Sequence, residues 1–244
     1  MSNLHYTAQG NGPPLVFVHG LAGSSRWWRA NTRLLSKHFT VYLVDLPGFG
    51  RSRATGRGPL AELVASLPGW LDRHGLERVH LVGHSMGGYI ASHLAATRPE
   101  RVGRLALIDS VGIPLNLNVA QMLRRVLQGL PHSAPLFVPI VVADGLRAGL
   151  PYLLRLTNEI VQVDTRVLLP QIEAPTLLLW GTRDTVVPPA LGLEMSELIP
   201  DSRFYFIPRA GHNAMADRPE LVNRYLVDFF LQALPSEQPI DVDG

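Results

Sequence analysis

Short runs of apolar residues recur along the chain, and stretches with helical periodicity lie between them. Most of these runs are apolar on both faces, which is typical of parallel strands covered by helices on each side. Leu4–Gln9 is the exception and is expected to be an antiparallel edge strand, ended by the turn-forming residues Gly10 to Pro14. The expected parallel strands are Leu15–His19, Val41–Asp45, Val79–Gly83, Leu105–Asp109, Thr176–Trp180 and Arg203–Ile207.

Helical stretches separate the strands, and this alternation predicts an α/β protein with a doubly wound, mostly parallel sheet. The last helix is expected to begin at Asp217, because a capping residue there is followed by Pro219 and Glu220 in the first turn. The expected helices are Arg26–Ser36, Pro59–His74, Met86–Thr97, Pro189–Leu198 and Asp217–Leu234.

Residues 111–169 interrupt the alternation because they contain no convincing strand. Apolar residues from Val119 to Leu130 recur at the spacing of an amphipathic helix, and prolines then divide the segment into short pieces. A helical insertion of this length should lie over one end of the sheet as a cap. We therefore expect a core of residues 1–110 and 170–234, a helical cap of residues 111–169 and a flexible tail of residues 235–244.

Composition narrows the function classes. Hydrophobic residues make up 46% of the 244 residues and charged residues 17%, so the chain can bury a sizeable core. The net charge is +2 and no basic run is present, which argues against a nucleic-acid partner. The absence of cysteine excludes disulfides, thiolate metal sites and cysteine nucleophiles. Without a recognisable signal peptide or spanning apolar run, we expect a cytoplasmic protein with no membrane partner.

The candidate nucleophile lies in the sequence Gly83-His84-Ser85-Met86-Gly87, which matches G-x-S-x-G. The match directly follows an expected strand and opens an expected helix, which is the setting that this motif requires. Glycines two residues on either side of Ser85 leave room for the strand and the helix to approach closely. A capping serine in an ordinary loop is the alternative. The context favours a serine nucleophile at position 85.

Serine needs a base that takes its proton, and the candidate is His212. It is the only histidine after Ser133, and it lies between the last expected strand and the last expected helix. A histidine in an ordinary surface loop is the alternative. The position of His212 relative to Ser85 in the chain favours the role of general base.

A carboxylate should orient the histidine, and two aspartates end strands between Ser85 and the last helix. Asp184 follows the strand Thr176–Trp180 by four residues, and the chain order Ser, Asp, His favours it. Asp109 ends the preceding strand and is the competitor. The backbone amides of Leu21 and Met86 are the candidate oxyanion donors.

Other polar or aromatic residues near these motifs have simpler interpretations. His19 is expected to hold the loop after the first parallel strand, and Asp45 to order a turn. Trp27 and Trp28 are expected to be core or pocket-wall residues.

Together these segments resemble the α/β-hydrolase family. They are HGLAGS at 19–24, DLPGFGRS at 45–52, GHSMGG at 83–88, WGTRDTVVP at 180–188 and AGHNAMADRPE at 210–220, in family order. The resemblance implies a helical cap inserted after the sixth strand and a Ser85-Asp184-His212 triad. The chain is also similar to the biotin-pathway esterases that act on pimeloyl-acyl-carrier-protein methyl ester, although it has Leu21 and His84 where those enzymes commonly have Trp.

The expected function is hydrolysis of carboxylic esters with small to medium apolar acyl groups, through an acyl-enzyme intermediate and without a cofactor or metal. The substrate is expected to be a small-molecule ester or an acyl-carrier-bound ester. A lactonase or a carbon–carbon bond hydrolase with the same triad is an alternative, in which Arg124, Arg125, Arg147 or Arg155 would hold a substrate carboxylate. A ligand receptor that keeps the triad is a further alternative.

Overall fold

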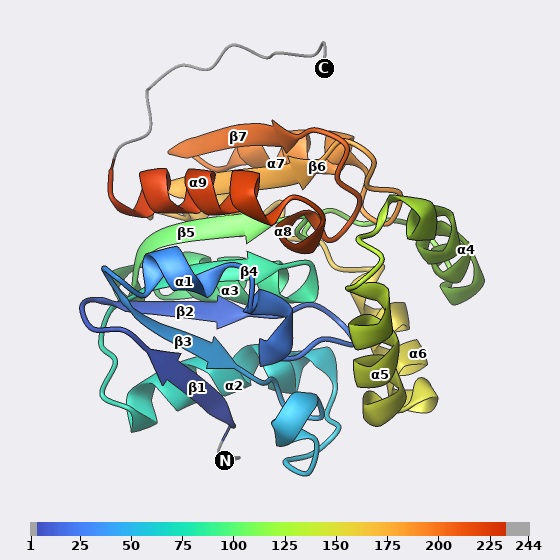
Figure 1. The fold of residues 1–244 in the computed structure, drawn as a ribbon, viewed down its shortest axis with the longest axis horizontal. Coiled ribbons are helices and arrows are strands. Elements are labelled where there is room, and N and C mark those ends of the chain that lie inside the picture. The colour runs from blue at the N-terminus through green and yellow to red at the C-terminus, as the bar shows by residue number, and fades with distance from the viewer. Residues whose placement is uncertain (1–3, 233–244) are drawn as a thin grey trace.

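A seven-stranded sheet forms the centre of the protein in a computed structural model, which describes residues 4–232. The strand order is β1-β3-β2-β4-β5-β6-β7, with β1 antiparallel to β3 and all other neighbours parallel (Figure 1). This confirms the predicted α/β class, the mostly parallel sheet and the antiparallel edge. The strands are β1 Tyr6–Gln9, β2 Pro14–Val18, β3 Thr40–Val44, β4 Val79–His84, β5 Val102–Ile108, β6 Thr176–Gly181 and β7 Ser202–Ile207.

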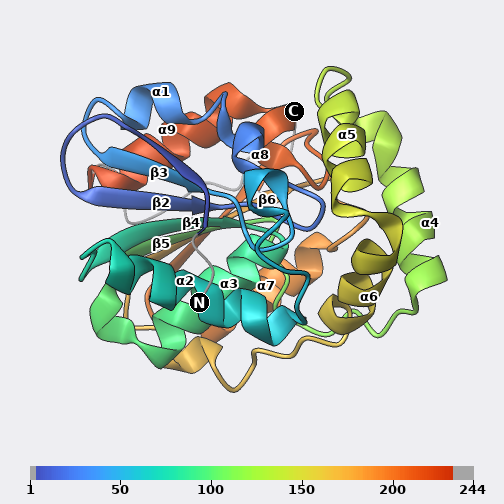
Figure 2. The same cartoon turned by 90° about the horizontal axis from the view of Figure 1, so that it is seen from below.

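Helices cover both faces of the sheet, as Figure 2 shows: α2, α3 and α7 lie below it, and α1 and α9 lie above. Alternate residues of β2 therefore enter two different apolar clusters. Val16 and Val18 pack with the side chains of α2 and α3, whereas Leu15 and Phe17 pack with those of α9. Burial on both faces is the physical reason for apolar runs without polar alternation. The covering helices are α1 Thr32–Leu35, α2 Leu60–Arg73, α3 Met86–Thr97, α7 Pro189–Leu198, α8 Ala214–Asp217 and α9 Pro219–Phe230.

The prediction of one helix over Arg26–Ser36 is wrong. The segment forms a 3-10 turn, η1 Ser25–Trp28, followed by the single turn α1. Between them the side chain of Asn31 donates hydrogen bonds to the carbonyl of Met215 at 3.1 Å and to Asn223 Oδ1 at 2.8 Å. These long-range bonds hold the backbone between the two turns, and Trp27 and Trp28 are both buried, as predicted.

The predicted helix start at Asp217 is also wrong. Helix α9 begins at Pro219, with Arg218 in the capping position, and Asp217 is the last residue of α8. The carboxylate of Asp217 accepts hydrogen bonds from the amides of Gly211 at 2.9 Å and Ala134 at 2.7 Å. It therefore accepts hydrogen bonds from the loop before His212 and from the cap, and not from the first turn of α9.

Three helices occupy the insertion between β5 and β6: α4 Val119–Gly129, α5 Val138–Ala148 and α6 Leu150–Ile160. They lie beyond the carboxyl ends of the parallel strands (Figure 1), and we call residues 111–169 the cap. The insertion follows β5, the fifth strand of the described residues, and not the sixth as the family resemblance implied, because only one antiparallel and four parallel strands precede it. The expected tail, residues 235–244, lies outside the described residues. Across residues 4–232, no helix has both the length and the apolar character needed to cross a bilayer.

Candidate active site

Ser85 occupies the turn between β4 and α3, as its motif predicts. Its backbone has φ 52° and ψ −119°, a conformation that costs a non-glycine residue about 1–3 kcal/mol. The flanking glycines are sterically required. A Cβ at Gly83 would lie 2.5 Å from the carbonyl oxygen of Gly87, and one at Gly87 would lie 2.2 Å from that of Val18. The close contact of strand and helix thus holds the serine side chain at the end of the sheet.

Ser85, His212 and Asp184 form a continuous hydrogen-bonded chain. His212 Nε2 lies 3.0 Å from Ser85 Oγ, and His212 Nδ1 lies 2.8 Å from Asp184 Oδ2. In the neutral ring Nδ1 donates to the carboxylate, so Nε2 is free to accept the serine proton. The other carboxylate oxygen of Asp184 accepts the amides of Val186 at 2.8 Å and Val187 at 2.9 Å. The structure therefore brings together the three residues that the sequence selected.

Asp109 lies in the same region but contacts different groups. Its oxygens accept hydrogen bonds from the amides of Gly181 at 2.8 Å and Ala214 at 3.0 Å. Burial, together with the charge of nearby Asp184, raises the pKa of Asp109 well above its usual range. This carboxylate thus joins the end of β6 to α8, whereas Asp184 is the one that contacts His212.

His84 is a further contact of the base that the sequence analysis did not select. Its Nε2–H donates to the backbone carbonyl of His212 at 2.8 Å, and the two rings lie 5.0 Å apart. Burial and the neighbouring His212 lower the pKa of His84 well below its usual value, so the ring is neutral. The available signal was a histidine directly before the candidate nucleophile, which alone does not identify its partner.

The two candidate oxyanion donors lie beside Ser85 in the fold. Met86 is the first residue of α3, so its amide has no acceptor within the helix. Leu21 follows Gly20, and a Cβ at Gly20 would lie 3.1 Å from the Cβ of Ser85. The loop that carries Leu21 therefore passes directly against the serine, close to where the oxyanion would form on a substrate carbon bonded to Ser85 Oγ.

His19 and Asp45 have the structural roles expected of them. His19 Nδ1–H donates to the carbonyl of Gly20 at 2.8 Å, and Nε2 accepts the amide of Leu46 at 3.1 Å. Asp45 accepts the amides of Ser25 at 2.6 Å and Arg51 at 2.8 Å. Both side chains are buried and connect loops at the end of the sheet.

Comparison with known proteins identifies the family. A family model described as alpha/beta hydrolase fold matches residues 13–151 and 149–219. This chain belongs to the α/β-hydrolase family. The fold, the sheet topology and the position of Ser85 after β4 agree with this membership.

Relatives within the family carry different activities in their names. A 2-hydroxy-6-oxononadienedioate/2-hydroxy-6-oxononatrienedioate hydrolase from Paraburkholderia phymatum is 32% identical over 94% of this chain and 91% of the relative. The dihydrolipoyllysine-residue acetyltransferase component of the acetoin cleaving system from Pseudomonas putida is 31% identical over 89% of this chain, which spans 63% of that protein. A thermophilic esterase structure from Thermogutta terrifontis has a TM-score of 0.80 and 27% identity over 94% of this chain and 93% of the esterase.

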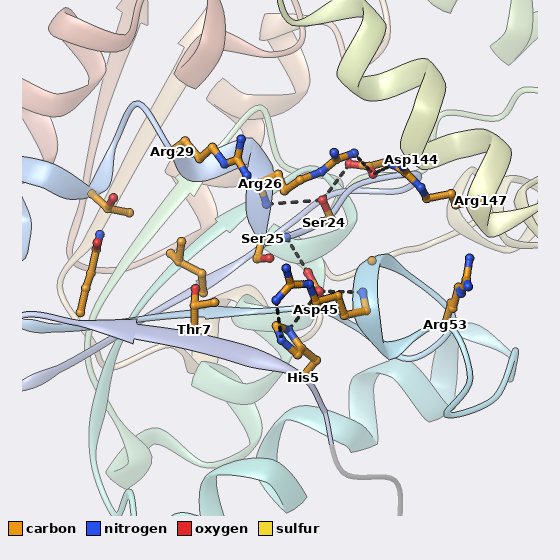
Figure 3. A pocket seen from close by; sticks show the side chains of 15 residues that line it. His5, Thr7, Ser24, Ser25, Arg26, Arg29, Asp45, Arg53, Asp144 and Arg147 are labelled. Carbon is orange, nitrogen blue, oxygen red and sulfur yellow. Dashed lines mark hydrogen bonds and ion pairs between the residues drawn. The ribbon is translucent and has the colours of Figure 1, made fainter.

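Two carboxylates attach the cap of this α/β hydrolase to its strand-end loops. Asp144 of α5 accepts a hydrogen bond from Ser24 Oγ at 2.7 Å and forms an ion pair with Arg26, as Figure 3 shows. Asp217 connects the cap residue Ala134 with Gly211, which immediately precedes His212. Both contacts join residues that are far apart in sequence, so neither could be read from local pattern.

Proposed function

We propose that this α/β hydrolase cleaves carboxylic esters with small to medium apolar acyl groups, using Ser85 as the nucleophile. The observation that carries the proposal is the hydrogen-bonded chain from Ser85 through His212 to Asp184, with distances of 3.0 and 2.8 Å. A serine hydroxyl bonded to an imidazole that is oriented by a carboxylate is the arrangement that activates serine for attack on a carbonyl group.

The reaction would proceed in two steps. In the first, Ser85 Oγ bonds to the ester carbonyl carbon as its proton passes to His212 Nε2, and the alcohol leaves with that proton. In the second, His212 takes a proton from water as the water oxygen bonds to the acyl carbon, and it returns that proton to Ser85 Oγ as the carboxylic acid leaves. The amides of Leu21 and Met86 would stabilise the oxyanion in both steps. Asp184 would hold the imidazole tautomer and stabilise the imidazolium.

Apolar residues close to the serine support the preference for apolar acyl groups. Val111, which is buried, donates its amide to the carbonyl of Ser85 at 3.2 Å. Trp27 packs against His84 and against Phe137 of the cap, with ring centroids 5.8 and 5.2 Å apart. An acyl chain bound between the cap and the strand ends would thus contact mainly hydrocarbon and aromatic surface. The similarity to the thermophilic esterase agrees with ester hydrolysis.

A chain-length series of p-nitrophenyl esters tests the proposal. Wild-type protein should release p-nitrophenol, fastest from a short or medium acyl chain, and Ser85→Ala should lower kcat by about 10⁴-fold or more. Ser92→Ala is the matched control, because Ser92 is a buried serine on the helix that follows Ser85, and its hydroxyl donates to the carbonyl of Tyr89 in the same helix. Equal activity in wild type and Ser85→Ala would refute the nucleophile assignment. Slow single-turnover release by a folded protein would favour the receptor alternative.

Carbon–carbon bond hydrolysis is the second candidate function. Arg125 of the cap has a buried Nη1 atom without a hydrogen-bond partner among the described residues, and its carbonyl accepts the hydroxyl of Thr185, next to Asp184. An unpaired guanidinium nitrogen on a residue whose backbone contacts Thr185 is a candidate to bind a substrate carboxylate. The 32% identical dienedioate hydrolase favours the same class. Loss of the yellow absorbance of a ring-cleavage product, abolished by Ser85→Ala and weakened by Arg125→Gln, would support this candidate over the ester hydrolase.

A further inference from the structure

An arginine-lined groove of about 800 Å³ lies apart from the candidate active site. Its walls come from the edge strand β1, the turns η1 and η2 (Gly50–Ser52) and the cap helix α5 (Figure 3). Ser85, Asp184 and His212 are not among the residues that line it. The groove is therefore a second recess, formed where the cap meets the edge of the sheet.

The groove holds more positive than negative charge. Five arginines from η1, η2 and α5 line it together with two carboxylates, a surplus of three positive charges when His5 is neutral. The arginines are Arg26, Arg29, Arg51, Arg53 and Arg147. Like charges gathered around one recess repel one another, and an anion placed between them would relieve that repulsion.

Both carboxylates of the groove, Asp45 and Asp144, are already bonded to other groups, so they do not neutralise all of the arginines. Asp45 accepts the backbone amides of Ser25 and Arg51, and His5 Nδ1 lies 3.4 Å from it. Asp144 accepts the hydroxyl of Ser24 and pairs with Arg26 and with Arg147 at 3.3 Å. Neither carboxylate contacts the guanidinium of Arg29 or of Arg53.

In the described part of the chain, three of the five arginines have no carboxylate partner: the guanidinium of Arg51 lies 3.4 Å from His5 Nε2, and those of Arg29 and Arg53 make no such contact. Both are exposed, and within residues 4–232 neither guanidinium has a hydrogen bond or an ion pair. In Figure 3 they lie on opposite sides of Asp45 and its contacts. Thr7, Gln9 and Thr32 add uncharged donors to the same lining. The groove thus contains two separate guanidinium groups without partners among the described residues, and a lining of polar side chains.

We propose that this groove binds a small polyanion that carries several phosphate or carboxylate groups. The planar guanidinium group matches both kinds of anion with two parallel N–H···O bonds, so Arg29 and Arg53 would each bind one end of an extended ligand. A volume of about 800 Å³ exceeds what a single phosphate or sulfate ion needs, which favours a ligand with more than one charged group. The proposal does not depend on the reaction at Ser85.

Calorimetric titration and thermal melting with sodium tripolyphosphate and, separately, sodium citrate test the proposal in a low-salt buffer. Wild-type protein should bind at least one of them, and at saturation its Tm should rise by about 3 °C or more. Arg29→Gln/Arg53→Gln should weaken binding at least tenfold without lowering the Tm of the free protein. The control Arg98→Gln/Arg224→Gln removes the same charge from exposed arginines outside the groove and should bind as wild type does.

The two ligands separate the phosphate and carboxylate sources, and binding of either one supports the site. A Tm rise no larger than that in sodium chloride of equal ionic strength would overturn the proposal, because it would reflect general screening. Equal binding by both double variants would overturn it as well, because the affinity would then arise from net charge and not from the groove.

Discussion

The strand-end region around Ser85 and the cap differ in which kind of side chain they bury. Around Ser85 the polar side chains of His84, Asp109 and Asp184 are buried, and each makes hydrogen bonds to groups from other elements. The cap instead exposes ten of the thirteen large apolar side chains that are exposed in the described residues. These are Leu123, Val126, Leu127, Leu130, Leu136, Val142, Leu146, Leu150, Leu154 and Val167.

This difference implies that the two regions tolerate substitutions to different degrees. A buried polar group that loses its partner costs about 1–3 kcal/mol, so the strand-end region tolerates little change. The cap contacts this region through a few directional bonds, those of Asp144 and Asp217 among them. Its exposed leucines contribute little to burial. We therefore expect catalysis and stability to depend strongly on the first region and weakly on the outer face of the second.

The largest expected effect is a difference in kcat between substitutions of the two aspartates of the strand-end region. Asp184→Asn should lower kcat for ester hydrolysis by about 10³–10⁴-fold, because the imidazole of His212 would lose the carboxylate that fixes its tautomer. Asp109→Asn should lower kcat less than tenfold, because Asp109 bonds backbone amides and not the base. Steady-state kinetics on both folded variants measures this. The reverse order of effects would make Asp109 the partner of His212.

The comparison predicts that substitution of a buried leucine lowers the free energy of unfolding much more than substitution of an exposed leucine of the cap. Leu178→Ala in β6 should lower the free energy of unfolding by about 2–5 kcal/mol, because Leu178 is fully buried and leaves a cavity. Leu146→Ala on α5 should change it by less than about 0.5 kcal/mol, since the side chain is 79% exposed. Urea denaturation measures both. A loss of more than 1.5 kcal/mol in Leu146→Ala would show that this face is covered, for instance by a second copy of the chain.

A smaller effect is expected from His84. His84→Phe should lower kcat about five- to tenfold, because the ring shape is kept but the hydrogen bond to the carbonyl of His212, worth about 1 kcal/mol, is lost. His84→Gln restores a donor and should recover activity to within about threefold of wild type. Kinetics with KM and kcat determined separately should place the loss in kcat. Equal loss in both variants would argue for a packing role.

The last prediction concerns the pH dependence of stability at Asp109. The pKa of this carboxyl is raised in the folded state above the value of about 3.9 that it has in an unfolded chain. The folded state therefore holds the proton more tightly, and the contribution of Asp109 to stability should fall as pH rises from 4 through the raised pKa. Asp109→Asn does not titrate, so the stability difference between wild type and variant should shift against wild type over this range. Urea denaturation at several pH values would show an unchanged difference if the carboxyl does not titrate there.

Much of the fold and the three site positions were predictable, because their signals are local. Each parallel strand is a short apolar run, and the motif around Ser85 follows one such strand directly. His212 was selected as the only histidine in the last part of the chain, and Asp184 by chain order over Asp109. The structure brings these positions into contact, and their catalytic roles stay predictions for the kinetics above.

The features that were missed depend on contacts between distant segments. The split of the helix expected over Arg26–Ser36 follows from bonds of Asn31 to residues near the carboxyl end of the chain. Asp217 has the local pattern of a helix cap, yet its carboxylate bonds the amide of Gly211 and, from the distant cap segment, the amide of Ala134. The apolar stripe of α4 predicts a buried face, whereas Leu123 and Leu127 are exposed and Met122 is buried.

Local sequence pattern was sufficient to predict the strands, their burial on both faces and the residue types at the candidate site, because apolar period and turn chemistry act over a few neighbouring residues. The amides that Asp109 bonds, the contact of His84 with the carbonyl of His212 and the gathering of five arginines in one groove follow only from the folded chain. Those outcomes depend on which side chains meet across the sheet and the cap, and a hydrogen bond or an ion pair between distant segments leaves no periodic trace in the chain.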